Sequence, residues 1–365
     1  MALKLIISQK ELSRKLKAVN SVIKPKNFIP ILDNILLDSN EGLHLIASSD
    51  SSLIKASVTT IECDGAISVC IPAKTLLSAI RELPDQPLEI NVDDDLNITV
   101  RYQSGHFEIK GITADEYPVM TIDEGTKLTI DCAGFVYNIK KARNFCANDE
   151  LRPVLNGVFF EFRTSGITYA ASDSTKLCLL ESKMTLSTSA SAIISSGDAK
   201  LIADVFDQKQ DITIEVSNSC SKYSCGDYEL ISKNIEGRYP NFRGVIPKSQ
   251  PLQFQLNKND LISAIRRVSL FSSDTNKLVV CQFGKELRIE SRDIDYAVGA
   301  EESVQIEIIS GNAKIGFNAN MILDVLSSIS TDSVTIHITD ERKAGVFQGV
   351  GNDDELYLLM PIMIQ

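Results

Sequence analysis

The sequence predicts an α+β protein built from three similar repeats, each composed of two strand–helix–strand–strand–strand units. Three observations lead to this prediction: one amphipathic helix recurs three times at nearly constant spacing, a shorter helix recurs behind it, and alternating strands bounded by turn residues lie between them. A length of 365 residues suits two or three domains better than a single core.

The first helix of each repeat follows a strand that ends in a helix-capping residue: Ser8, Asp131 or Asn257, at spacings of 123 and 126 residues. An apolar residue stands four positions after each cap, and two more follow at helical spacing. The predicted core positions are Leu12, Leu16 and Val19, then Phe135, Ile139 and Ala142, then Leu261, Ile265 and Val268.

A second, shorter helix is predicted to begin at Ala73, Ala199 and Ala319. Each has the same apolar face, and each has a polar residue at the equivalent position. These polar residues are Ser78, Asp204 and Asp324.

Alternating segments such as Leu88–Val92 and Ile98–Tyr102 predict strands, and the aspartates 93–95 between them favour a hairpin turn over a metal site. Polar residues interrupt the pattern at Asp123–Thr126 and Lys248–Gln250. The sequence therefore predicts three domains, at residues 1–124, 125–248 and 249–365.

Charge is distributed unevenly along the chain. The net charge is −11, yet the stretches 9–19, 135–147 and 258–268 together carry +8. A cation occupies the position opposite the core in all three first helices: Lys17, Lys140 and Arg266. One such helix would be an ordinary solvated face, but three of one sign in an acidic chain favour phosphate binding without base recognition. Since these helix faces carry no interleaved aromatic residues, stacking on single strands is not indicated there.

The sequence therefore predicts sequence-independent binding of duplex DNA. The candidate DNA-binding residues are Lys10, Arg14, Lys17, Lys26, Lys74, Lys140, Lys141, Arg143, Lys200, Arg266 and Arg267.

Short motifs spread over the whole chain resemble the bacterial DNA polymerase III β subunit family, the sliding clamps. These motifs are Ile29-Pro-Ile-Leu, Leu155-Asn-Gly-Val, Ala171-Ser-Asp-Ser-Thr-Lys-Leu, Glu236-Gly-Arg-Tyr-Pro-Asn-Phe-Arg, Leu323-Asp-Val-Leu and Leu358-Leu-Met-Pro. The resemblance implies three similar clamp domains per chain. Two chains would close head-to-tail into a six-domain ring with helices inside and sheets outside.

The resemblance also implies a function. Such a ring encircles duplex DNA and tethers the replicative DNA polymerase as a non-catalytic processivity factor. The implied partners are duplex DNA, a second copy of the chain, the polymerase α subunit, the clamp-loader δ subunit and other proteins with a clamp-binding motif.

These partners would dock in a peptide-binding pocket between the second and third domains. The positions that match this pocket are Arg152, Leu155, Ser172, Ser174, Thr175, Lys176, Leu177, Pro240, Val245, Asn318, Met321, Leu358, Leu359, Met360, Pro361 and Ile362. An alternative interpretation makes Leu177, Leu358 and Met360 ordinary core residues.

The chain departs from the family pattern in three places. Ser174-Thr175-Lys176 stands where the family often has Gly-His-Arg, which removes a planar Arg fork. Gly244 stands where some members have a second Arg, and Pro153-Val154 stand in place of paired aromatics. These differences bear on peptide preference and DNA contact rather than on the fold.

The seven residues before Gln365, from Leu358 to Ile364, are all apolar. Chain ends are normally polar and frayed, so this segment predicts a partly exposed apolar patch that binds partners.

No catalytic or cofactor motif stands out: the sequence lacks a P-loop, HExxH, GxSxG and a GxGxxG after a strand. We therefore expect no enzyme activity, metal or cofactor. The alternative is a nucleic-acid-processing enzyme that uses the basic helix faces, but it would need carboxylates clustered beside them. Eight scattered cysteines without a CxxC pair, and the lack of a signal peptide or an apolar span, predict a cytoplasmic protein that does not enter membranes.

Overall fold

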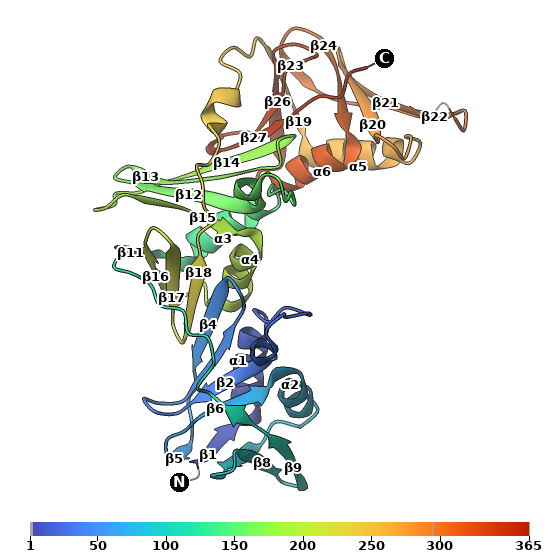
Figure 1. Cartoon of the computed structure of the whole chain (residues 1–365). Coiled ribbons are helices and arrows are strands. Elements are labelled where there is room, and N and C mark those ends of the chain that lie inside the picture. Colours follow the sequence, from blue (N-terminus) through green and yellow to red (C-terminus); the bar gives the residue numbers. More distant parts are fainter. Residues whose placement is uncertain (1–2, 294, 365) are drawn as a thin grey trace. The chain divides into compact units, whose positions relative to one another are not determined.

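The computed structural model describes residues 3–293 and 295–364 (Figure 1). It divides into two compact units, one of residues 1–137 and 197–234 and the other of residues 138–196 and 235–365. Each unit holds one five- or four-stranded sheet and one nine-stranded sheet, and all strand pairs are antiparallel.

The smaller sheet of the first unit has five strands. Their order is β5 (Glu62–Asp64), β1 (Leu3–Ser8), β7 (Pro87–Val92), β8 (Asn97–Tyr102) and β9 (Gly105–Lys110). The larger sheet runs β10 (Ile112–Thr113), β6 (Ser68–Pro72), β2 (Asn34–Asp38), β3 (His44–Ser48), β4 (Ser52–Ser57), β18 (Tyr228–Lys233), β17 (Cys220–Cys225), β16 (Asp211–Val216) and β11 (Thr126–Asp131). Because β4 pairs with β18, this sheet joins strands of the first and second repeats.

The second unit repeats the plan. Its larger sheet runs β15 (Ala190–Ser195), β12 (Gly157–Arg163), β13 (Gly166–Ser172), β14 (Lys176–Lys183), β27 (Asn352–Leu359), β26 (Gly345–Gly349), β25 (Ser333–Ile338), β19 (Leu252–Asn257) and β23 (Glu307–Ser310). Its smaller sheet runs β22 (Val298–Val304), β21 (Leu287–Asp293), β20 (Leu278–Phe283) and β24 (Ala313–Asn318). Here β14 pairs with β27, which joins strands of the second and third repeats.

The units therefore differ from the repeats, because each nine-stranded sheet takes strands from two of them. The boundaries near residues 124 and 248, read from the repeats, stay predictions.

The described residues contain six α-helices, two for each repeat. They are α1 (Gln9–Asn20), α2 (Ala73–Arg81), α3 (Cys132–Arg143), α4 (Ser196–Val205), α5 (Lys258–Ser269) and α6 (Ala319–Ser328). Short 3₁₀ turns lie at η1 (Pro30–Asp33), η2 (Pro153–Asn156) and η3 (Phe242–Val245). None of the helices in the described part is long and apolar enough to cross a bilayer.

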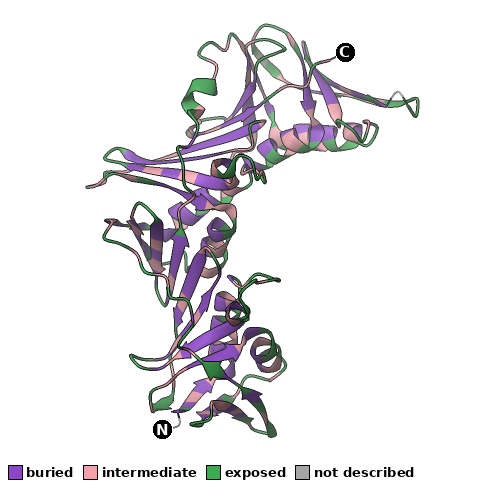
Figure 2. Ribbon diagram, viewed as in Figure 1, coloured by how far each residue is buried: buried purple, intermediate pink, exposed green. Residues whose placement is uncertain are grey.

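The helices bury the faces that the sequence predicts. All nine predicted core positions of α1, α3 and α5 are buried, and the buried residues concentrate along strands and inward helix faces in Figure 2. Helices α5 and α6 lie side by side, with α5 also against β20–β22 (Figure 1). Because apolar residues recur with the helical period of 3.6 residues, the charged faces of these helices lie away from the sheets.

The helix starts follow the predicted caps in part. The side chain of Asn257 accepts hydrogen bonds from the backbone amides of Asn259 and Asp260 at the start of α5, whereas Ser8 makes no such bond to α1. α2 and α6 begin at the predicted alanines, but α4 begins at Ser196, three residues before Ala199. The predicted hairpin is confirmed, because Asp93 accepts from the amides of Asp95 and Asn97 between β7 and β8.

Candidate functional site: basic helix faces and two apolar clusters

The outer position of each first helix is exposed, as predicted. Lys17, Lys140 and Arg266 are all exposed, on the sides of α1, α3 and α5 opposite their buried core residues. The candidate cations Lys10, Lys26, Lys74 and Lys200 are also exposed. Local periodicity predicts this exposure for the cations on helices, whereas Lys26 lies in the loop after α1.

Other cations of these helices are already paired. Lys15, which added to the positive count of the first helix, is fully buried: its Nζ lies 2.7 Å from Asp227 and 4.3 Å from the Tyr228 ring centroid. The Arg14 guanidinium forms an ion pair with Glu11 at 2.8 Å, and Arg267 pairs with Glu302. These contacts reduce the charge that each helix offers to a ligand.

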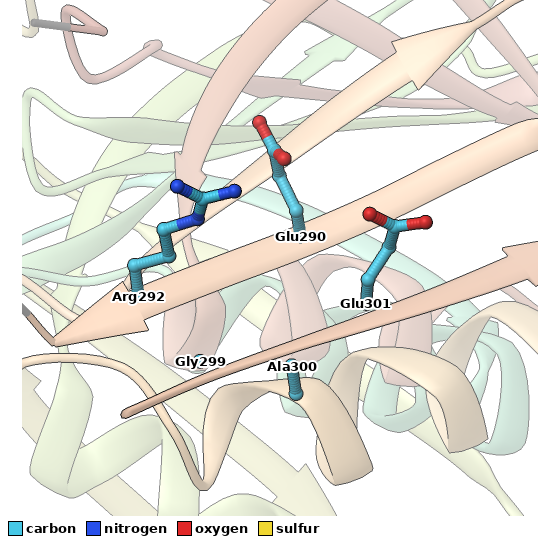
Figure 3. Close-up of a pocket in the computed structure, with 5 residues that line it drawn as sticks. All are labelled: Glu290, Arg292, Gly299, Ala300 and Glu301. Atoms are coloured by element: carbon cyan, nitrogen blue, oxygen red, sulfur yellow. The ribbon is translucent and has the colours of Figure 1, made fainter. Parts of the chain in front are cut away.

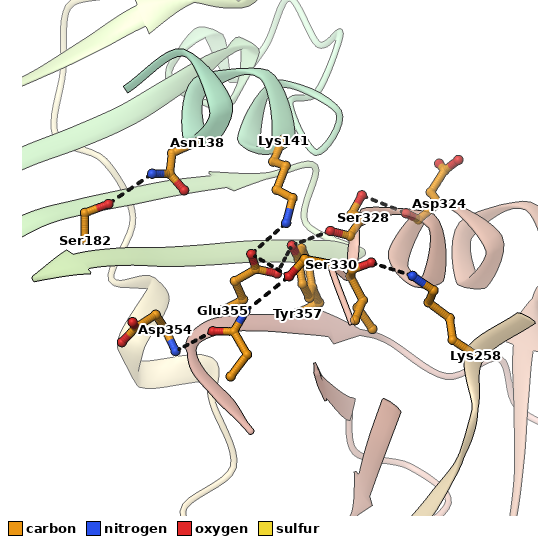
Figure 4. Close-up of polar contacts among 12 residues, drawn as sticks. Asn138, Lys141, Ser182, Lys258, Asp324, Ser328, Ser330, Asp354, Glu355 and Tyr357 are labelled. Carbon is orange, nitrogen blue, oxygen red and sulfur yellow. Dashed lines mark hydrogen bonds and ion pairs between the residues drawn. The ribbon is translucent and has the colours of Figure 1, made fainter. Parts of the chain in front are cut away.

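Lys141 corrects the sequence analysis. Its side chain is only 14% exposed, and its Nζ lies 2.6 Å from the Glu355 carboxylate of β27. Figure 4 shows Lys141 pointing from α3 toward Glu355, which also accepts from the hydroxyls of Tyr357 and Ser330. The prediction that Lys141 belongs to the exposed cationic face is therefore wrong.

Arg143 also turns toward the protein. Its Nε donates to the backbone carbonyl of Ser196 at 2.9 Å, and the residue is half-buried. Of the three candidate cations on α3, Lys140 alone is exposed.

The candidate peptide site contains an apolar cluster across the β14–β27 pair. Leu177 faces Leu358 in the strand register, and these two form a buried cluster with Ala344. Phe242 and Ile246, both half-buried, pack against it. The alternative interpretation as core residues therefore fits Leu177 and Leu358, which are both buried. The half-buried Phe242 and Ile246 pack against them.

A second cluster lies beside the first. Leu155 packs with Ala170, Ile193 and Tyr239, and Phe242 contacts this cluster as well. The Phe242 ring lies 5.9 Å from that of Phe159 and 6.3 Å from that of Tyr239. Phe242 therefore connects the two apolar clusters.

Sequence reasoning did not select Phe242, Ile246 or Ala344. Phe242 belongs to the Glu236-Gly-Arg-Tyr-Pro-Asn-Phe-Arg motif, so its position could have been found from that stretch. Ala344 gives no local signal, because its role comes from packing against residues distant in the chain.

The loop between β13 and β14 forms the polar edge of the site. Asp173 Oδ1 accepts from the amides of Thr175 and Lys176, each at 2.8 Å. Ser174 has a positive φ of 78°, and its hydroxyl accepts from Arg152 Nη1 at 2.5 Å. This network places the predicted residues Arg152, Ser174 and Thr175 together.

The C-terminal segment runs along this loop. The Met360 amide donates to the Thr175 carbonyl at 2.8 Å, and the Ile362 amide donates to the Gly316 carbonyl at 2.8 Å. Met360 is 41% exposed, whereas Leu359 is fully buried. Leu359 therefore belongs to the core, and Met360 is open to a ligand.

Two predicted peptide contacts have internal partners instead. Lys176 is buried, with its Nζ 2.6 Å from Asp324 of α6 and 5.2 Å from the Phe145 ring. Asn318 caps α6 through Oδ1 and donates to the Asn276 carbonyl. The ammonium of Lys176 is therefore held by α6, and its contact with a partner peptide stays a prediction.

The remaining predicted positions are exposed or half-buried. Pro240 and Val245 are exposed, and Ser172, Met321, Pro361 and Ile362 are half-buried.

Three of the cavities formed by the described residues lie in the second unit. One, of about 850 Å³, follows the C-terminal segment and is lined in part by Leu278, Val280, Ile362, Met363 and Ile364. Another, of about 460 Å³, lies at the β12–β14 ends, near Arg163, Lys183 and Arg243. The third, of about 260 Å³, is polar and lies on the β21–β22 pair, where Figure 3 shows Glu290, Arg292 and Glu301.

No candidate metal site lies in these cavities among the described residues. Residues 3–293 and 295–364 contain no group of three or more His, Cys, Asp or Glu side chains placed to hold a metal ion. Burial raises the pKa of the Cys146 thiol to about 12 and raises that of Cys178 well above its usual value, so both thiols are protonated at neutral pH.

Comparisons with known proteins cover the whole chain. Three family models match in order: DNA polymerase III beta subunit, N-terminal domain, at residues 3–121; its central domain at 129–241; and its C-terminal domain at 243–363. A beta sliding clamp from Synechocystis sp. is 25% identical, over 99% of this chain and 100% of the relative. One from Vibrio cholerae is 24% identical, with the same coverage.

Solved structures share the fold. A sliding clamp (DNA polymerase III subunit beta) from Pseudomonas aeruginosa, bound to griselimycin, aligns with a TM-score of 0.95 at 22% identity, covering 100% of both chains. The DNA polymerase III beta subunit from Thermotoga maritima aligns with a TM-score of 0.93 at 24% identity and the same coverage.

Proposed function

Because the chain belongs to the DNA polymerase III beta subunit family, it is a DNA sliding clamp, and we propose that it encircles duplex DNA as a homodimeric ring and tethers the replicative polymerase. The observation that carries the proposal is the ordered match of three family domains over nearly the entire chain. The exposed cations Lys17, Lys140 and Arg266, at one position of three equivalent helices, support contact with the phosphate backbone.

The ring proposal rests on the repeats. Three domains, at residues 1–124, 125–248 and 249–365, would need a two-fold partner to complete a ring of six. In such a ring the protein holds DNA by topology, so it needs no base recognition and no chemical step. We accordingly propose a cytoplasmic, non-catalytic protein.

Partners would bind over the apolar clusters of the second unit. One cluster contains Leu177 and Leu358, the other contains Leu155, and Phe242 packs against both. Met360 and Val245 are exposed at this site and can close over an incoming apolar side chain. The polymerase α subunit and the clamp-loader δ subunit are the proposed ligands, each through a short linear motif.

Retention on circular DNA tests the proposal. After enzymatic loading, the protein should stay on a closed circle through gel filtration and be lost when the circle is cut once. A nuclease or another nucleic-acid-processing enzyme bound through the basic faces would be retained equally on both forms, and that result would contradict the ring.

A further inference from the structure

The loop between α1 and η1 presents an aromatic side chain to solvent. Phe28 is fully exposed, and its neighbour Ile29 is 55% exposed. Pro25 lies in the middle of the loop and Pro30 directly follows it, and each restricts the backbone φ angle at its position. The phenyl ring in this restrained loop is therefore open to contact with a ligand.

Hydrogen bonds hold the loop in this position. Asn27 Nδ2 donates to the Lys24 carbonyl at 3.2 Å and to Asp33 Oδ1 at 2.8 Å. The Lys24 ammonium pairs with Asp50. These bonds connect Asn27 to both Lys24 and Asp33, and the side chain of the adjacent Phe28 lies in solvent.

The charge around Phe28 suits a nucleic acid. Lys26 is exposed and forms no ion pair within the described residues, and Lys17 is exposed in the last turn of α1, which leads into the loop. The exposed ring of Phe28 thus stands beside an exposed lysine, the combination with which single-strand-binding proteins stack bases and contact the backbone.

The equivalent loop of the second repeat provides a contrast. Leu151 follows Phe28 by 123 residues, the spacing that separates Ser8 from Asp131, and it is 92% exposed. Its neighbours are Asp149 and Glu150, and Arg152 is paired with Asp149 at 2.8 Å. The same place in the repeat is therefore apolar in both loops, but only the first combines an aromatic ring with an unpaired lysine.

We propose that Phe28 and Lys26 form a stacking site for an unpaired nucleobase in single-stranded DNA that adjoins the encircled duplex. A base within a duplex has both faces covered by its neighbours, so the ring can stack only where a strand is unpaired or frayed. Lys26 would contact the adjacent phosphate. The proposal rests on the proposed function, which supplies the DNA, and adds a contact that the helix faces do not make.

The absence of tryptophan from the chain makes a direct test possible. Phe28→Trp introduces a single indole into the intact protein, and stacking on a base quenches indole fluorescence. We expect quenching by a duplex with a single-stranded tail and little change with the blunt duplex of the same sequence. Leu151→Trp, the matched position in an acidic loop, should respond to neither.

Binding of tailed and blunt duplexes by further variants completes the test. Phe28→Ala should bind the tailed duplex about 5-fold more weakly and the blunt duplex as the unmodified protein does, within the range expected for loss of one base stack. Phe28→Tyr should restore tailed binding, and Phe28→Leu should not, because it keeps the apolar surface without the aromatic ring.

Equal quenching by both duplexes, or unchanged tailed binding by Phe28→Ala, would overturn the proposal. Either result would leave the proposed function standing if the unmodified protein still binds blunt duplex in a salt-dependent way. Loss of that salt-dependent binding would instead contradict the proposed function.

Discussion

At the scale of single residues, the adjacent lysines of α3 have opposite surroundings. Lys140 is exposed, whereas Lys141 is 14% exposed and paired with the 8% exposed Glu355. Removing one partner of a buried pair leaves the other charge uncompensated, which costs about 3–5 kcal/mol. The same substitution at an exposed lysine costs little.

We therefore expect Lys141→Met to lower the free energy of unfolding by about 3 kcal/mol or more, with Lys140→Met as the matched control. Urea unfolding of both variants measures this. Lys141→Met combined with Glu355→Gln should recover most of the loss, because the amide keeps a hydrogen-bond acceptor for Tyr357 and carries no charge. Equal stability of Lys140→Met and Lys141→Met would show that the buried pair is absent in solution.

For the exposed cations we expect an effect on DNA affinity rather than on stability. Changing Lys17, Lys140 and Arg266 together to Ala should leave folding nearly intact, because each lies opposite the helix core. Each lost phosphate contact should reduce the slope of log affinity against log salt by about one unit, for any DNA sequence. Affinity measured at several salt concentrations tests this, and an unchanged slope would show that these helix faces do not contact DNA.

At the scale of elements, the C-terminal segment joins two sheets of the second unit. Strand β27 ends at Leu359, and the residues beyond it hydrogen-bond first to the β13–β14 loop and then to β24. The buried part of the tail thus belongs to the sheet, and the exposed part begins at Met360. A deletion from Met360 onward therefore spares the strand.

We expect a chain lacking Met360–Gln365 to remain a dimer that encircles DNA, while partner peptides bind at least ~10-fold more weakly, a loss of ~1.4 kcal/mol or more. Fluorescence anisotropy of a labelled peptide against the truncated dimer measures the affinity. Unchanged affinity would move the docking site elsewhere. Collapse of the dimer would mean that the tail is part of the core.

At the scale of the whole molecule, the repeats determine where the exposed positive charges lie. The chain carries a net charge of −11 but places cations at one position of three equivalent helices. Since acidic surfaces repel DNA, we propose that DNA binds only at the cationic faces. Cations spread over three equivalent helices would hold DNA without a single tight contact, as a sliding ring requires.

The proposed ring needs two chains, so sedimentation at micromolar concentration should give twice the chain mass of 40.1 kDa. This assembly should persist in the triple Ala variant, whose changes lie on helix faces. A stable monomer at that concentration would contradict the six-domain ring.

The sequence determined the repeat, the six helices and the exposed position on three of them, because all depend on spacing within a few residues of one another. Leu12, Leu16 and Val19 must share a face of any helix, so Lys17 must lie opposite. Short-range turn chemistry likewise fixed the hairpin at Asp93. The resemblance to the family then supplied the function, and the three matching family domains agree with it.

The tertiary structure decided which polar residues are available to a ligand. Lys15 meets Asp227 across 212 residues, Lys141 meets Glu355 across 214, and Lys176 meets Asp324 across 148. The role of Phe242 between two apolar clusters arises in the same way. Periodicity assigns a side chain to a face of its own element, but pairing across such distances depends on how the sheets bring separate repeats together, and only the folded chain provides that.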